Sequence, residues 1–161
     1  MIEPDKRSSE WAVKLAYAEK TEERFYVPEN VYILGMMNTA DRSLAVVDYA
    51  LRRRFAFATM TPAFGQDAFR RNLLANAVDE ETVDRIVERM TALNEAIAGD
   101  TANLGRGYCI GHSFFSPTDG DGERSTTWYN AIIETQIIPL LEEYWFDQPD
   151  KVYQWRARLL A

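Results

Sequence analysis

The 161-residue sequence has one cysteine, Cys109, and one histidine, His112. A single cysteine excludes a disulfide framework within the chain and is typical of a reducing compartment. One cysteine and one histidine also cannot form a zinc site, and we expect no metal site. No charged-then-apolar leader pattern is present, and no apolar run approaches about 18 residues. We therefore expect a soluble, cytoplasmic protein that makes no contact with a membrane.

Positive charge is scarce. The chain has 18 Lys and Arg against 25 Asp and Glu, which gives a formal net charge of −7. This balance argues against a broad basic face that grips nucleic acid, although it leaves room for a local basic cluster.

Three motifs of phosphate and metal chemistry are missing. The sequence contains no G-x-x-x-x-G-K-[ST] loop, which would cradle phosphates through its backbone N–H groups. No apolar strand ends in Asp-Asp or Asp-Glu, a common magnesium-binding arrangement. The P-D…[D/E]-x-K pattern of metal-dependent nucleases is also absent. On its own, the chain therefore has no evident site for nucleotide hydrolysis or DNA cleavage.

The N-terminal third has the patterns of a sheet. Alternation in "WAVKLAY" (11–17) and the short apolar "RFYV" (24–27) predict a hairpin. The run "VYILGMMN" (31–38) is apolar without alternation, which favours a strand buried on both faces of a parallel sheet. A helix over 43–55 and a strand over 55–60 would complete a β-α-β unit.

After Pro62 the patterns are helical only. A short helix is expected over 67–77, and an apolar stripe with spacings of three and four predicts a longer one from a cap at Asp79 to Gly99. Pro139 should kink or split the next helix, and Pro149 should begin the last one. The fold class is therefore α/β, with an α/β part over 1–62 and a helical part over 63–161.

The string "MMNTADRSLAVVDYALRRRF" (36–55) contains the most distinctive polar residues. Asn38 closes the expected buried strand, where ligands bind in open α/β sheets. Asn38 to Asp41 resembles the guanine-reading N-K-x-D tetrapeptide with its lysine replaced. The pattern alone leaves three interpretations open: base reading, phosphate sensing, or capping of the next helix.

The string "VYILGMMNTADRSLAVVDYALRRRF" closely resembles the AAA+ NTPase motor of the McrB family, the motor subunits of 5-methylcytosine-specific restriction enzymes. The resemblance continues through "LGRGYCIGHSFF" and "IIPLLEEYWFDQPDKVYQW" and covers almost the whole chain. It implies the C-terminal part of an AAA+ nucleotide-binding subdomain, a parallel-sheet portion with a hairpin, followed by an all-helical lid. The Walker A and Walker B motifs of the family lie upstream, so we expect a truncated chain that is inactive alone.

The resemblance implies roles at the start of the helix over 43–55. Asn38 matches sensor 1, whose amide orients the attacking water and the γ-phosphate. Asp41 is expected to act as a cap or interface acid with Arg42 as its partner, and a contact of Asp41 with guanine is the minor alternative.

Three consecutive arginines end that helix, where the helix dipole already favours positive charge. The resemblance assigns the arginine finger, which enters the neighbouring subunit's site, to Arg53 or Arg54, with Arg54 ranked first and Asp48 orienting it. Arg52 is expected to be solvated. In the Gly-rich loop, Arg106 or His112 is the candidate for sensor 2, although a lone histidine is more often a structural hydrogen-bond partner.

The expected function is therefore part of a GTP- or ATP-hydrolysing motor in a modification-dependent DNA restriction system. The resemblance implies GTP or ATP with Mg²⁺ in the parent protein and no nucleotide on this chain alone. It also implies a homo-oligomeric ring, a separate nuclease subunit, and DNA contacts made mainly by parts absent here. Two alternatives remain: a non-catalytic module that docks on a full-length motor or nuclease subunit, and part of a general AAA+ remodelling ATPase.

Overall fold

The computed structural model describes residues 3–17, 24–37, 52–117 and 124–161. The chain divides into two units, residues 1–59 (unit 1) and residues 60–161 (unit 2). The predicted domains, 1–62 and 63–161, differ from these units because they were drawn from the expected change of fold and not from contacts. The domain boundary at residue 62 stays a prediction.

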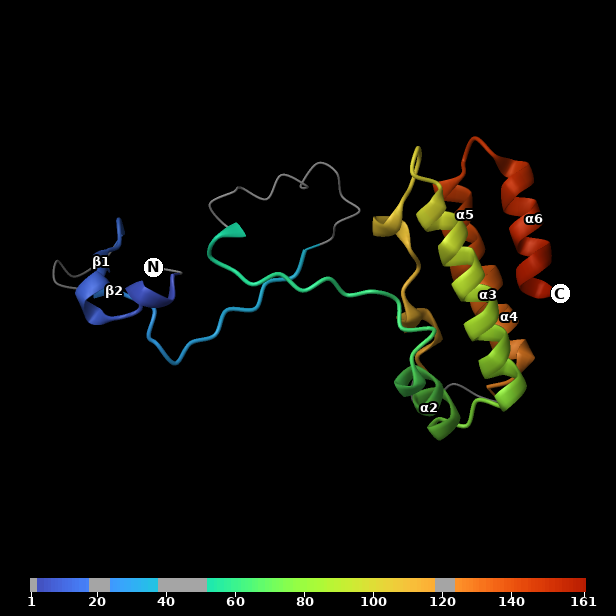
Figure 1. The fold of residues 1–161 in the computed structure, drawn as a ribbon, viewed down its shortest axis with the longest axis horizontal. Coiled ribbons are helices and arrows are strands. Elements are labelled where there is room, and N and C mark those ends of the chain that lie inside the picture. The colour runs from blue at the N-terminus through green and yellow to red at the C-terminus, as the bar shows by residue number, and fades with distance from the viewer. Residues whose placement is uncertain (1–2, 18–23, 38–51, 118–123) are drawn as a thin grey trace. The chain divides into compact units, whose positions relative to one another are not determined.

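Unit 1 contains one small sheet among its described residues. Strand β1 (Val13–Lys14) pairs antiparallel with β2 (Arg24–Phe25), with Val13 opposite Phe25 and Lys14 opposite Arg24 (Figure 1). Two 3₁₀ turns, Pro4–Lys6 and Ser9–Trp11, precede β1. The predicted hairpin is confirmed, although its strands are shorter than the alternation in the sequence indicated.

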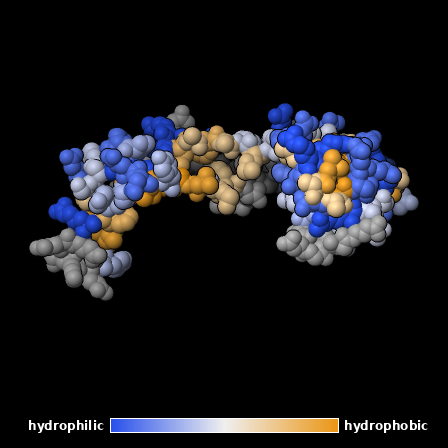
Figure 2. Space-filling model, turned by 90° about the horizontal axis from the view of Figure 1, so that it is seen from below, coloured by the Kyte–Doolittle hydropathy of each residue, from blue (hydrophilic) through white to orange (hydrophobic). Residues whose placement is uncertain are grey.

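Two predicted strands, one over 31–38 buried on both faces and one over 55–60, are wrong where the structure describes them. Residues 31–37 and 55–60 have no regular secondary structure, and Leu34 and Met36 are 93% and 96% exposed. Figure 2 accordingly shows orange, apolar areas on the surface of the molecule. A central strand needs hydrogen-bonding neighbours at both edges, and no strand among the described residues pairs with either segment. The parallel sheet is therefore not formed within the described chain.

Unit 2 is helical. Its helices are α2 (Asp67–Ala75), α3 (Glu80–Gly99), α4 (Thr126–Ile132), α5 (Ile138–Tyr144) and α6 (Pro149–Leu160). Helix α3 contacts α2, α4 and α6, and α5 contacts α6. Helices α3 to α6 lie side by side in Figure 1. The prediction of a helical C-terminal part is confirmed.

Helix α3 has the predicted apolar stripe, and it begins and ends where the sequence predicted. Val83, Ile86, Met90, Leu93 and Ile97 are buried along one face, as their spacing predicted. The Asp79 carboxylate caps the helix by accepting a hydrogen bond from the Thr82 N–H at 2.8 Å. The helix ends at Gly99, so the stripe, cap and end were all readable from the sequence.

Prolines lie in the first turns of the last two helices. Pro139 lies in the first turn of α5, and a π-helical turn, Ile133–Ile137, joins α4 to α5. Because proline has no N–H, it cannot supply the usual hydrogen bond four residues back, and a π turn is one way to accommodate that gap. Pro149 begins α6. Both prolines therefore act where the sequence predicted.

All the buried apolar residues of the described chain lie in unit 2, between Phe64 and Leu159. They form one cluster in which α3 packs against the C-terminal helices and the connecting loop. Among the described residues, no helix is both long and apolar enough to cross a membrane.

Candidate functional site

The loop that follows α3 is the best-defined candidate site in unit 2. Leu104, Ile110 and Phe115 anchor this loop in the core, and two 3₁₀ turns, Arg106–Tyr108 and His112–Phe115, lie between and beside the anchors. Gly105 has a φ of 92°, a conformation that glycine adopts without the strain a Cβ would cause. The loop is thus irregular in secondary structure but fixed at three points.

Asn94 of α3 holds the middle of the loop. Its side-chain amide donates to the Ile110 carbonyl at 2.9 Å, and its side-chain oxygen accepts from the Ile110 N–H at 2.7 Å. The Cys109 thiol lies 3.6 Å from the Asn94 carbonyl, and burial raises the pKa of this thiol. Our sequence interpretation missed Asn94. Its signal was a polar side chain between Met90 and Ile97, at helical spacing on the apolar face of α3.

Arg106 is presented at the surface of this fixed loop. Its side chain is exposed and makes no hydrogen bond or ion pair with the described residues. Two positions further on, Tyr108 packs edge-on against Tyr144 of α5, with ring centroids 5.3 Å apart. A planar guanidinium binds phosphate or carboxylate oxygens in bidentate fashion. Arg106 is therefore the candidate in this loop for contact with an anionic group, and this role stays a prediction.

His112 has structural contacts. Its Nδ1 accepts a hydrogen bond from the Ala63 N–H at 3.2 Å, and its ring lies edge-on to Phe69, with centroids 5.6 Å apart. Because Nδ1 accepts, it carries no proton in this arrangement. His112 thus ties the start of unit 2 to the loop, and its predicted contact with nucleotide stays a prediction.

The three consecutive arginines of unit 1, Arg52 to Arg54, lie within the described residues. Arg54 Nε donates to Glu3 Oε1 at 2.6 Å, and the Arg52 guanidinium lies 5.8 Å from the Phe57 ring centroid. The pKa of Glu3 is lowered to about 2, first by its own backbone N–H and then by Arg54. Arg53 is exposed. Their predicted finger role stays a prediction.

The other predicted site residues, Asn38, Asp41, Arg42 and Asp48, lie outside the described residues. Within the described chain, no group of three His, Cys, Asp or Glu side chains is arranged to hold a metal ion. The candidate site that the structure does define is the loop around Arg106, braced by Asn94, Tyr108 and His112.

Two comparisons with known proteins found matches. One match covers the region of the candidate site, and the other covers the whole chain. A family model described as the McrB alpha-helical lid domain matches residues 85–153, which include most of α3, the Arg106 loop, α4, α5 and the start of α6. Over 162 aligned residues, the chain is 51% identical to the type IV methyl-directed restriction enzyme EcoKMcrB subunit of Escherichia coli (strain K12). That match covers 100% of this chain and 35% of the relative, so the chain spans about a third of that protein's length.

Proposed function

The chain belongs to the McrB family, and from this premise we propose that it forms the helical lid and the preceding segment of an AAA+ motor that hydrolyses GTP or ATP. The motor would serve a modification-dependent DNA restriction system. The name of the Escherichia coli relative, a subunit of a methyl-directed restriction enzyme, supports this assignment.

The observation that carries the proposal is the presentation of Arg106. Its guanidinium is exposed, makes no ion pair with the described residues and stands on a loop held by Asn94. A lid that closes over a nucleotide needs such a cation, because phosphate charge grows on the leaving group during phosphoryl transfer. Arg106 would bind a phosphate oxygen of the nucleotide as sensor 2.

The remaining roles are proposed from the family resemblance. Asn38 would orient the attacking water as sensor 1, and Asp41 with Arg42 would shape the adjoining turn. Arg53 or Arg54, oriented by Asp48, would enter the site of the next subunit in a ring of identical copies. Mg²⁺ and the phosphates would be held by a P-loop and acidic residues that this sequence does not contain.

The same resemblance suggests the partners. A separate nuclease subunit would cut DNA, and hydrolysis in the ring would drive DNA translocation. Because this sequence lacks a P-loop, we expect the purified chain to hydrolyse neither GTP nor ATP above the buffer rate. Robust hydrolysis by the chain alone would contradict the proposal.

Substitution of Arg106 tests the site directly, in a protein that joins a P-loop segment to this chain. We expect Arg106→Ala to lower kcat/KM for nucleotide hydrolysis about tenfold to a hundredfold, the range of one charge-assisted hydrogen bond. Arg71→Ala is the matched control, because Arg71 is an exposed arginine of α2 without an ion pair among the described residues. An Arg106→Ala protein as active as the control would remove Arg106 from the site.

The absence of a P-loop also favours a second candidate, a non-catalytic module that docks on a full-length motor or nuclease subunit. The coding sequence upstream separates the two. A continuous reading frame with G-x-x-x-x-G-K-[ST] supports the motor, whereas an independent promoter directly upstream supports the module. A comparison of GTP with ATP as substrate of the longer protein would then distinguish a restriction motor from a general remodelling ATPase.

A further inference from the structure

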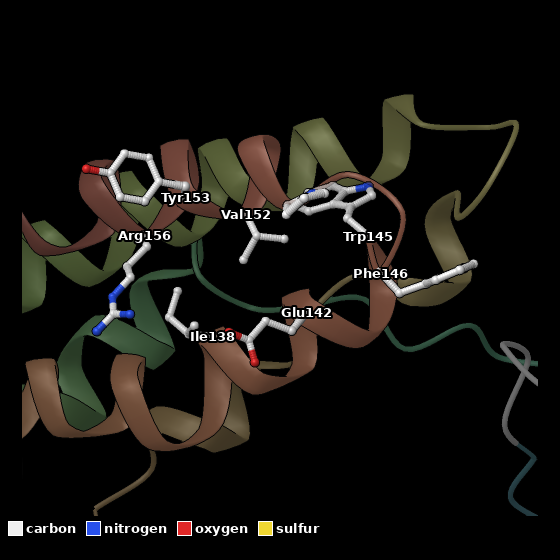
Figure 3. A pocket seen from close by; sticks show the side chains of 8 residues that line it. Ile138, Glu142, Trp145, Phe146, Val152, Tyr153 and Arg156 are labelled. Atoms are coloured by element: carbon white, nitrogen blue, oxygen red, sulfur yellow. The ribbon is translucent and has the colours of Figure 1, made fainter.

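A groove of about 220 Å³ lies between α5 and α6, and none of the residues that line it belongs to the loop that carries Arg106. Its apolar floor is formed by Ile138, Trp145 and Val152, which are buried in the core of unit 2. Figure 3 shows Ile138 on one helix and Val152 on the other, with both side chains directed into the space between the helices.

Two large aromatic side chains border the groove and remain in solvent. Phe146 is 82% exposed and Tyr153 is 74% exposed, and they lie toward opposite ends of the groove in Figure 3. Neither side chain has a ring contact or a hydrogen bond among the described residues. Exposed aromatics beside an apolar floor are typical of interfaces, where Tyr and Phe supply much of the buried area.

The surroundings of the groove are acidic. Glu142 lines it, and Glu143, Asp147 and Asp150 flank Phe146 within four positions along the chain. These carboxylates are exposed and make no ion pair with the described residues. One cation, Arg156, also lines the groove, and it pairs with Glu134 at 2.8 Å. Lys151, at the start of α6, pairs with Asp100 at 2.8 Å.

We propose that this groove is a docking site for a basic amphipathic segment of a partner protein. One or two apolar side chains of the segment would cover Ile138 and Val152 between Phe146 and Tyr153. Its Lys or Arg side chains would face Glu142 and the acids beside Phe146. The same negative charge disfavours nucleic acid and anionic membranes, which a basic surface would attract.

The test uses the whole chain and two labelled probe peptides of about 14 residues, long enough to form a helix on binding. The first peptide carries leucines along one helical face and lysines elsewhere, and the second replaces each lysine with glutamate. Fluorescence anisotropy measures the affinity of both. We expect the lysine peptide to bind at least about tenfold more tightly than the glutamate peptide, with affinity falling as salt rises.

Variants then locate the site. The double variant Phe146→Ala with Tyr153→Ala should weaken the lysine peptide about tenfold, as expected for exposed aromatic anchors. Glu142→Lys should weaken it severalfold by reversing the charge at the groove. Glu88→Lys on α3 makes the same charge change outside the groove and should have little effect. Circular dichroism checks that each variant keeps its helices.

Three outcomes would overturn the proposal. Equal affinity for the two peptides would show that charge does not select the occupant. Absence of binding at peptide concentrations up to about 1 mM would remove the groove as a peptide site. Concentration-dependent self-association that is lost in the Phe146 and Tyr153 double variant would assign the groove to a second copy of this chain instead.

Discussion

Asn94 shows how one polar side chain on an apolar face fixes a loop. Both its donor and its acceptor are used by the backbone of Ile110, which is buried. A buried N–H and C=O without partners carry a desolvation penalty. The amide of Asn94 therefore satisfies two backbone groups that no regular secondary structure would pair, and the loop can stay irregular while it presents Arg106.

Replacement of Asn94 by alanine should destabilise unit 2. We expect Asn94→Ala to lower the free energy of unfolding by about 1–3 kcal/mol, the usual penalty for leaving a buried backbone group unpaired. Urea unfolding followed by circular dichroism measures this change. Asn72→Ala is the control, because Asn72 is exposed on α2 and should change stability by less than about 0.5 kcal/mol. Equal effects of the two substitutions would contradict the proposed role of Asn94 in holding the loop.

Asp100 makes the stability of unit 2 depend on pH. Its Oδ2 accepts from Trp145 Nε1 at 2.9 Å and from Lys151 Nζ at 2.8 Å. These bonds, that of Lys151 first, lower the pKa of Asp100 from 3.8 to about 2. A lowered carboxyl pKa contributes stability above the unfolded-state pKa and loses it as the pH falls toward the folded-state value. The contribution of Asp100 is therefore complete above about pH 4 and disappears toward pH 2.

The Asp100→Asn variant tests this pH window. We expect the thermal midpoint of the variant to be a few degrees lower near pH 7, and this difference should shrink as the pH falls from about 4 to 2. Asp150→Asn serves as the control, because Asp150 is exposed and makes no ion pair with the described residues. A constant difference across the whole pH range would show that Asp100 acts by packing rather than by charge.

At the scale of whole elements, local signals predicted the helices of unit 2 and the hairpin of unit 1, and failed for the strands expected over 31–38 and 55–60. The stripe of α3, its cap Asp79 and the first-turn Pro149 of α6 are all local in sequence. The apolar run at 31–37 resembles a buried strand, yet a strand depends on partners distant in sequence. The predicted partners were not available among the described residues. Periodicity therefore predicts an element that closes its own hydrogen bonds better than one that does not.

The sequence predicted only part of the candidate site, because contacts between residues distant in sequence position its side chains. Arg106 and His112 were singled out by the family resemblance of the loop in which they stand, but their separate placements depend on tertiary contacts. His112 receives a hydrogen bond from Ala63, which is 49 positions away, and no local pattern indicates that bond. The exposure of Arg106 likewise depends on Asn94 and Tyr108, which hold the loop on either side of Cys109.

The N-terminal cap of α3 gives a prediction at this scale. Asp79 accepts from the Thr82 N–H, and chiefly this bond lowers the pKa of its carboxyl. We expect Asp79→Ala to reduce the free energy of unfolding by about 1 kcal/mol, as for other cap residues. Asp79→Asn keeps a cap acceptor and should cost less. Chemical denaturation of the three proteins checks the order, and equal losses for both variants would contradict the capping role.

At the scale of the whole molecule, burial is confined to unit 2. No described residue of unit 1 is buried, whereas the core runs from Phe64 to Leu159. Hydrophobic burial is the main favourable term in folding. Cooperative unfolding of this chain should therefore belong to residues 60–161, and the residues of unit 1 should add little to it.

Calorimetry of the whole chain tests this distribution. Unfolding of globular proteins absorbs about 0.7 kcal/mol per residue near 60 °C, which gives about 70 kcal/mol for the residues of unit 2 and about 110 kcal/mol for the whole chain. We expect a single transition close to the lower value, at the same midpoint as for a polypeptide of residues 60–161. A value close to the higher one would mean that unit 1 unfolds with the core. In that case, the apolar run at 31–37 would have to be buried in solution, as its sequence first predicted.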